Sequence, residues 1–222
     1  MRLLFACVIV LGCLGCSDTA GTSKARAPVV KPDAEGFVSL HESGQNLIQF
    51  STKSEKKPDG VYWVREDGFG FEGSGRAYAH TRKSYKNFTL RFDVRWPNAA
   101  ELSEEDRPNA NTGVLVFITG EHKIWPKCLE VQGKWSELGH IKSNAKEVTV
   151  TVRDNEDARQ QARKPVGEWN SIEIVAKDGA LTSYVNDVKI AESDPTELVE
   201  GPIGFQAERY DVEFRNVRIR EE

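Results

Sequence analysis

The sequence predicts an all-β fold: a two-sheet antiparallel β-sandwich, of jelly-roll or related topology, that follows an N-terminal signal peptide and a flexible tether. Apolar and polar residues alternate in several short segments, which is the period of a half-buried strand. Turn pairs such as Asp-Gly and Gly-Pro separate these segments. No long stretch has a helical period, and helical turns are expected only within 100–105 and 156–163. About a dozen short strands joined by tight turns are typical of a sandwich.

The first residues predict export. Met1 and Arg2 form a short positive start, and the apolar run 3–14 that follows is too short to cross a bilayer as a helix. A short positive start before a short apolar run is typical of a secretory signal peptide. We therefore expect this segment to be processed rather than folded.

The end of the apolar run, Leu-Gly-Cys-Ser, resembles the lipobox of bacterial lipoproteins, in which a cysteine after a small residue is acylated and becomes the new N-terminus. We expect residues 1–15 to be the lipoprotein signal peptide and Cys16 to be the lipidation site. Cys13 is the alternative, less favoured because cleavage there would leave Leu14 and an unpaired Cys16 on the mature end. The membrane is then a partner through the lipid anchor, with the protein facing the periplasm or the cell surface.

Beyond the cysteine, residues 16–35 carry Thr, Ser, Ala and Gly around two prolines, without a hydrophobic period, and predict a lipidated flexible tether. Residues 36–222 are expected to form one domain, because sandwiches of this size commonly fold as one unit. Cys128 is the only cysteine in that range, so no internal disulfide can form there.

The charge pattern argues against nucleic acid as a partner. The chain has 34 acidic and 30 basic residues, a formal net charge of -4, and the two signs are mixed along its length. Such a distribution offers no basic patch to follow a phosphate backbone.

Several strands can be placed from the alternation. Residues 88–95 and 147–153 alternate strictly, and the same rhythm recurs around 172–174. Residues 114–118 are apolar on both parities, which predicts a strand in the interior of a sheet. Near the C-terminus the apolar parity changes, so we expect a β-bulge at Arg215-Asn216.

Several short motifs, in their order and spacing, resemble a family described as 3-keto-disaccharide hydrolases, over roughly residues 36–220. The motifs are Gly36-Phe37-Val38-Ser39-Leu40, Asn111-Thr112-Gly113-Val114, Leu129-Glu130-Val131-Gln132, Gly167-Glu168-Trp169-Asn170, Gly201-Pro202-Ile203-Gly204-Phe205-Gln206 and Phe214-Arg215-Asn216-Val217-Arg218-Ile219. The resemblance implies a concanavalin A-like lectin/glucanase fold. It also implies a sugar-facing groove on the concave sheet and cleavage, by hydrolysis or elimination, of glycosides oxidised at C3.

The alternation independently selects one strand of these motifs as the candidate site. Glu130 and Gln132 share a face with Cys128, whereas Leu129 and Val131 point into the core. We therefore expect a carboxylate and an amide side by side on an exposed sheet face.

Glu130 is the first candidate for catalysis, as general base or acid, and the alternative is a solvated glutamate paired to a neighbouring arginine. His122 is the histidine nearest to this strand in sequence, and its ordinary pKa near 6.5 suits proton exchange, although a single loop histidine is often inert. The expected substrate-binding residues supply amides, cations and indoles for a sugar: Gln132, Arg95, Asn111, Trp125, Lys134 and Trp135.

Two departures from the family pattern keep a second function open. Phe117 occupies the region where the family usually has an arginine, and no histidine follows Phe205-Gln206 closely. We expect a carbohydrate-active envelope enzyme, with a non-catalytic lectin-like carbohydrate-binding module as the alternative. No cofactor is identified, and a divalent metal stays open because the loop 97–110 is acidic, although a solvated loop explains it as well.

Overall fold

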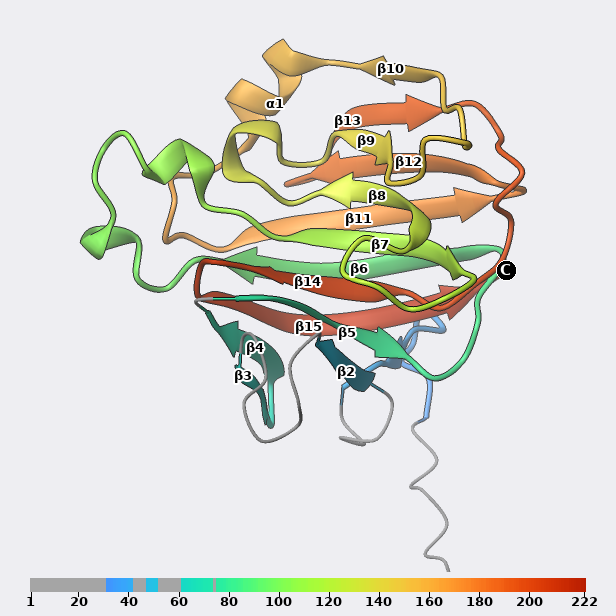
Figure 1. Ribbon diagram of the computed structural model, residues 1–222, viewed down its shortest axis with the longest axis horizontal. Helices are drawn as coiled ribbons and strands as arrows, with labels where there is room; N and C mark the ends of the chain where they lie inside the picture. The colour runs from blue at the N-terminus through green and yellow to red at the C-terminus, as the bar shows by residue number, and fades with distance from the viewer. Residues whose placement is uncertain (1–30, 42–46, 52–60, 74) are drawn as a thin grey trace, which may run out of the picture.

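The computed structural model describes residues 31–41, 47–51, 61–73 and 75–222. The predicted signal peptide, Cys13 and Cys16 lie outside the described residues. Within these ranges no helix is long and apolar enough to span a membrane. The described chain is almost entirely strand and loop, and it folds as two antiparallel sheets that face each other (Figure 1).

The larger sheet has nine strands among the described residues. Its order is β10-β13-β12-β11-β6-β15-β4-β3, and β1 pairs with β15. We call it the nine-stranded sheet. Its strands are β1 (Val38–Ser39), β3 (Val61–Arg65), β4 (Gly68–Glu72), β6 (Phe88–Arg95), β10 (Val152–Asp154), β11 (Asn170–Lys177), β12 (Ala180–Val185), β13 (Val188–Ser193) and β15 (Val212–Glu221).

The second sheet, called the six-stranded sheet, has the order β2-β5-β14-β7-β8-β9 and lies in front in Figure 1. Its strands are β2 (Leu47–Ser51), β5 (Arg76–Thr81), β7 (Gly113–Thr119), β8 (Lys127–Gln132), β9 (Ile141–Ser143) and β14 (Gly204–Glu208). The described helical segments are short: η1 (Ala99–Glu101), η2 (Arg107–Asn109), η3 (Trp135–Glu137) and α1 (Glu156–Ala162). Two of them confirm the helical turns expected near 100–105 and 156–163.

The core lies between the two sheets. Phe205 of β14 contacts three phenylalanines of the nine-stranded sheet, Phe69, Phe92 and Phe214, with ring centroids 5.1 to 5.7 Å apart. All four rings are buried. Aromatic rings at these separations bury large areas and favour edge-on contacts, so this cluster fixes one sheet against the other.

Three expectations about the strands are confirmed. β6 occupies residues 88–95 and alternates in burial, and β7 has strands on both sides. The bulge is present in β15, because the pairing with β6 shifts register between Arg215 and Arg218. Asn216 takes a φ of 53° there, and it donates to the carboxylate of Asp93 across 2.8 Å.

The expected strand at 147–153 is wrong for most of its length. Only Val152–Asp154 form a strand, and Val148 donates its backbone N–H to Ala145, as in a turn. Val148 is buried and Val150 packs against the core. The alternation therefore marks side chains that pack inward, whereas the backbone pairing with β13 begins only at Thr151, which accepts the N–H of Asp194 at 2.9 Å.

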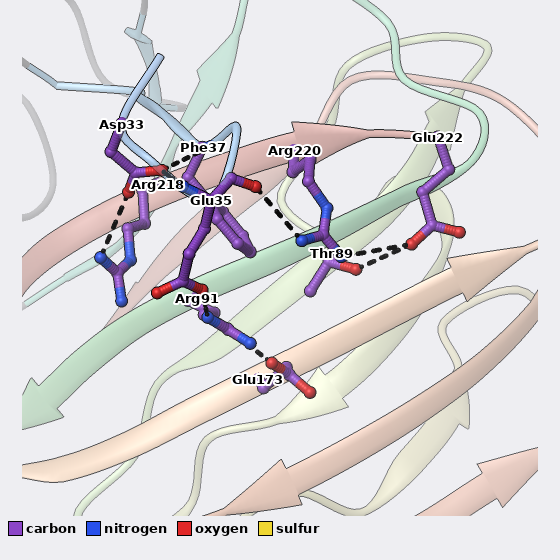
Figure 2. Close-up of polar contacts among 9 residues, drawn as sticks. All are labelled: Asp33, Glu35, Phe37, Thr89, Arg91, Glu173, Arg218, Arg220 and Glu222. Carbon is purple, nitrogen blue, oxygen red and sulfur yellow. Dashed lines mark hydrogen bonds and ion pairs between the residues drawn. The ribbon is translucent and has the colours of Figure 1, made fainter.

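The first described residues fold over the outer face of the nine-stranded sheet (Figure 2). The Asp33 carboxylate accepts the backbone N–H groups of Glu35 and Phe37, both at 2.9 Å. The Glu35 carboxylate lies 2.6 Å from Arg91 of β6, and that of Asp33 lies 3.5 Å from Arg218 of β15. We call residues 33–37 the N-terminal clasp, so contacts with the sheet begin within the last part of the predicted tether.

Phe37 is the apolar part of the clasp. It is 2% exposed but lies outside the core between the sheets. Three guanidinium groups surround its ring, those of Arg91, Arg218 and Arg220, at 4.6, 5.4 and 4.9 Å from the centroid. Cation–π contacts and the stems of the arginines thus bury this ring on an otherwise polar face.

Candidate functional site

The outer face of the six-stranded sheet carries the candidate site. Alternate residues of each strand point outward, and the strand registers align them in rows across the sheet. One row consists of Lys142, Glu130, Leu115, Gly204 and His80. The next row consists of Gln132, Gly113, Gln206 and Tyr78.

Glu130 lies in the middle of β8 and its side chain is 2% exposed. One carboxylate oxygen, Oε1, lies 3.5 Å from the Lys142 ammonium of β9. The other oxygen, Oε2, is buried and has no hydrogen-bond partner. A buried carboxylate oxygen without a partner is costly, and functional sites are a common place for that cost to be retained.

Gln206 faces Glu130 from β14, two strands away. It is 1% exposed, and neither its amide oxygen nor its amide nitrogen has a hydrogen-bond partner. Gly113 lies on the strand between the two. A Cβ there would be 2.4 Å from the Gln206 amide oxygen and 2.7 Å from Glu130 Oε1. A glycine at this position therefore lets a carboxylate and an amide converge over the backbone of β7.

A second carboxyl group lies beside this pair. Glu208 of β14 accepts a hydrogen bond from the Asn111 amide at 2.7 Å and lies 3.9 Å from Arg76 of β5. Arg76 also lies over the ring of Trp125, 5.8 Å from the centroid. The predicted binding residues Asn111 and Trp125 thus belong to the neighbourhood of Glu130, where Arg76 and Glu208 link them.

Both carboxyl groups hold their protons more tightly than usual. Burial raises the pKa of Glu130, and this outweighs Lys142 and Asn144, which lower it; the charge of Glu208 raises it further. Burial also raises the pKa of Glu208, opposed by Arg76 and Lys142. Two neighbouring carboxyls with raised pKa values are candidates for proton transfer.

His122 is held by two residues of β5. Its Nδ1 is 2.7 Å from the Tyr78 hydroxyl, and its ring stacks on His80 with centroids 4.4 Å apart. Burial lowers the pKa of His80. The backbone of His80 lies three strand spacings from that of Glu130, about 14 Å. The Tyr78 ring that holds His122, however, packs in one cluster with Cys128 of β8, two residues before Glu130.

The sheet face around the predicted pair is covered, which corrects the expectation of an exposed face. Glu130 and Gln132 both point outward from β8, as the alternation predicted, yet they are 1% and 5% exposed. A buried apolar cluster of Tyr78, Leu115, Ile118 and Cys128 occupies the same face. Gln132 is held locally, because its amide oxygen accepts the backbone N–H of Lys134 at 2.8 Å.

Three predicted binding residues lie away from the residues around Glu130. Arg95 belongs to β6 of the nine-stranded sheet, where it pairs with Glu213 at 2.6 Å and stacks on Trp169. The Lys134 ammonium pairs with Glu137 at 3.2 Å. The Trp135 indole donates to the backbone of Lys164 at one end of the sandwich. Alternation shows that a side chain points outward, but it does not show from which sheet.

Sequence reasoning missed Gln206, Glu208 and Arg76 as site residues. The alternation in 204–208 contains the signal for the first two, since Phe205 and Ala207 are inward and the polar residues outward. Their position beside Glu130 depends on the pairing of β14 with β7, which connects strands far apart in the chain.

No group of three or more His, Cys, Asp or Glu side chains that could hold a metal ion occurs within the described ranges. In the acidic loop 97–110, the carboxylates of Glu101, Glu104, Glu105 and Asp106 belong to exposed residues. Ser103 and Asp106 bond to each other within the loop. The structure thus gives this loop the form of a solvated segment.

A family model described as the 3-keto-alpha-glucoside-1,2-lyase-like domain matches residues 36–220. This range contains both sheets and all the residues of the candidate site. No curated protein matches the chain.

Solved structures of similar fold come from sugar-related proteins. A candidate glycosyl hydrolase from Parabacteroides distasonis is 18% identical with a TM-score of 0.54, covering 84% of this chain and 99% of its own. The carbohydrate binding module CBM66 from Bacillus subtilis is 11% identical with a TM-score of 0.51, and the match covers 84% of this chain and 96% of the module. The exoplasmic/lumenal domain of VIP36, bound to Ca²⁺ and Man3GlcNAc, is 7% identical with a TM-score of 0.51, and the match covers 86% of this chain and 90% of that domain. At these identities the likeness establishes a lectin-like β-sandwich fold.

Proposed function

The chain belongs to the 3-keto-alpha-glucoside-1,2-lyase-like family, and from this premise we propose that its domain cleaves glycosides that carry a ketone at C3. The observation that carries the proposal is the buried pair of Glu130 and Gln206. Its carboxylate oxygen Oε2 and both amide atoms lack partners within the described chain. A polar ligand placed over Gly113 would supply the missing hydrogen bonds.

The proposed reaction begins with proton abstraction. A ketone at C3 acidifies the hydrogen on C2, because the resulting carbanion is delocalised onto the ketone oxygen as an enolate. Glu130 takes this proton, and its raised pKa makes its carboxylate a stronger base than an exposed glutamate. The enolate then collapses: the C3 carbonyl re-forms, the electron pair forms a C1=C2 double bond, and the C1–O bond to the leaving group breaks.

The leaving oxygen needs a proton, and we assign this role to Glu208. Its pKa is also raised by burial, so it stays protonated to higher pH than an exposed glutamate. It is close enough to Glu130 for its charge to raise the pKa of Glu130. A pair of coupled carboxyls can divide the roles of base and acid. His122, whose ring is held by Tyr78 and His80, is assigned to contact with the leaving-group sugar rather than to proton transfer.

Access to Glu130 requires movement. Its side chain is 2% exposed, and the ammonium of the neighbouring Lys142, whose side chain is 38% exposed, lies 3.5 Å away. Substrate entry would displace this flexible cation from Glu130. The displaced ammonium could then turn to the developing enolate oxygen, where a positive charge stabilises the transition state.

The alternative function is carbohydrate binding without reaction. The observation that favours it is the covered carboxylate itself, together with a fold shared with a carbohydrate binding module and a lectin-like domain. Because one fold hosts many functions, the fold does not decide between the two. Turnover is the measurement that separates them.

The test uses p-nitrophenyl 3-keto-α-glucoside and purified protein, with and without added divalent metal. We expect release of p-nitrophenol, a sugar product one water lighter than the hydrolysis product, and slower release when C2 carries deuterium. Glu130→Gln should abolish release, whereas the matched variant Glu137→Gln, in the short helix η3 after β8, should not. Binding of the substrate without release in the parent protein would establish the binding module instead.

We also propose that the protein is exported and anchored to an envelope membrane by lipid on Cys16. The support is the sequence of residues 1–17 alone. Labelled palmitate should be incorporated in a bacterial host by the parent and by Cys13→Ala, and should be lost in Cys16→Ala. Incorporation that persists in Cys16→Ala and disappears in Cys13→Ala would move the anchor to the alternative cysteine.

A further inference from the structure

A cavity lies at one end of the sandwich, away from the outer face of the six-stranded sheet. Its volume is about 910 Å³, within the range of roughly 300–1,000 Å³ that is common for small-molecule sites. Three separate segments line it: the loop from Pro97 to Pro108, the start of η3 at Trp135, and the end of α1 with residues 163–167.

Hydrogen bonds between these segments build the cavity. The Trp135 backbone donates to Ala110 at 2.8 Å, and its indole donates to Lys164 at 2.8 Å. Arg163 Nη1 donates to the backbone oxygens of Trp135 and Ser136 at 3.1 and 2.8 Å. The walls are thus fixed to one another by backbone groups.

Arg163 has no ion pair at contact distance among the described residues. No carboxylate of the described chain lies within ion-pair distance of its guanidinium, which instead stacks on the Trp135 ring, 3.8 Å from the centroid. Burial lowers the pKa of Arg163, the charge of Arg159 lowers it further, and the charge of Glu156 opposes both. Arg159, by contrast, is paired with Asp154.

Arg107 is a second cation on the cavity wall and also has no ion pair among the described residues. Glu104 is the only carboxylate on the lining, so the lining carries one net positive charge. The rest is largely apolar: prolines, alanines, Val166 and the Trp135 ring. An anion attached to a body with an apolar face would complement both parts.

We propose that this cavity is a second ligand site, which binds a sugar acid by placing its carboxylate between Arg107 and Arg163 and its ring against the apolar wall. A guanidinium fork matches a carboxylate in two parallel hydrogen bonds, and stacking on Trp135 holds the Arg163 fork in one plane. Pyranose rings carry apolar C–H faces that pack on tryptophan and proline. The site is distinct from the proposed reaction, since it shares none of the residues around Glu130.

The test is an NMR titration with methyl β-D-glucuronide and its neutral counterpart methyl β-D-glucoside, in low salt. The Trp135 indole N–H, identified by Trp135→Phe, reports on the cavity. We expect saturable shifts with the glucuronide only. Binding should weaken about tenfold in Arg163→Lys, which keeps the charge but loses the fork, and about threefold in Arg107→Gln, which removes an exposed partner.

Lys177→Gln is the matched control, because it removes one exposed positive charge at the opposite end of β11. It should bind the glucuronide as the parent does, and so should Glu130→Gln. Equal shifts with glucoside and glucuronide would overturn the proposal, as would parent-like affinity in both arginine variants. Arg107→Gln keeps the test valid if Arg163→Lys is unstable, since Arg107 is exposed and unpaired.

Discussion

The side chains of Glu130 and Gln206 meet over Gly113, although their strands β8 and β14 are not neighbours in the sheet. The strand between them carries a hydrogen atom where any other residue would place a carbon. The space left by the missing side chain of Gly113 is therefore as much a part of the candidate site as the two polar groups.

Replacing Gly113 by alanine should fill the space above β7 in which the two side chains meet. The added Cβ would be 2.4 Å from the Gln206 amide oxygen and 2.7 Å from Glu130 Oε1. Both contacts are the ends of flexible side chains, so the fold should survive at a cost of about 1–3 kcal/mol, while the pair is pushed apart. Turnover should fall about tenfold or more.

The stability of the protein should fall as pH rises, because of Glu130. Burial raises the pKa of this carboxyl above its ordinary value of 4.5, so the folded protein binds the proton more tightly than the unfolded chain. The stabilisation is complete below that ordinary value and is lost as pH rises through the raised pKa. Glu130→Gln, which cannot ionise, should show a smaller loss in urea midpoint between about pH 5 and about pH 8.

Glu208 acts in the same direction, since its pKa is raised by burial as well. Part of the pH dependence should thus remain in Glu130→Gln and shrink again when Glu208→Gln is added. The surface variant Glu137→Gln should follow the parent curve. A parent curve that rises over this interval while the double variant stays flat would contradict the assigned burial of both groups.

The N-terminal clasp should depend on Phe37 more than on its ion pairs. Phe37→Ala removes a buried ring and should cost about 3 kcal/mol. Glu35→Gln removes a partly exposed ion pair to Arg91 and should cost about 0.5 kcal/mol. Urea unfolding of both variants measures the difference; equal costs would mean that the ion pairs, not the ring, hold the segment.

The bulge in β15 should depend on the conformation of Asn216. Its φ of 53° is tolerated by asparagine and glycine but strained for a β-branched residue. Asn216→Val should cost about 2 kcal/mol from the strain and the lost bond to Asp93. Asn216→Gly should cost less, because glycine relieves the strain. Thermal unfolding of the two variants gives the comparison, and equal losses would indicate that only the bond to Asp93 matters.

The sequence was sufficient for the sandwich, the bulge and the outward direction of Glu130, because each depends on local alternation. The parity change between Phe214 and Val217 required an extra residue in the strand, and the register shift between Arg215 and Arg218 is that residue's effect. Val148 and Val150 misled the strand prediction, since inward-facing side chains can alternate along a backbone that has no ladder partner.

The membership of the site could not be predicted in the same way. Gln206 joins Glu130 only because β14 is placed beside β7, and Arg95 is removed from it because β6 belongs to the other sheet. Both facts depend on pairings between distant segments. The burial of Glu130 depends on side chains from several strands, so it too has no local signal in 127–132.

The N-terminal clasp also determines which strands would bear a mechanical force applied at the N-terminal end of the described chain. Glu35, Asp33 and Phe37 are attached to arginines of β6 and β15, which are neighbours in the interior of the nine-stranded sheet (Figure 2). Tension that enters at residue 31 would therefore load the middle of that sheet, where each strand has a partner on both sides, and would not peel away an edge strand. The six-stranded sheet, with Glu130 and Gln206, lies outside this path of force.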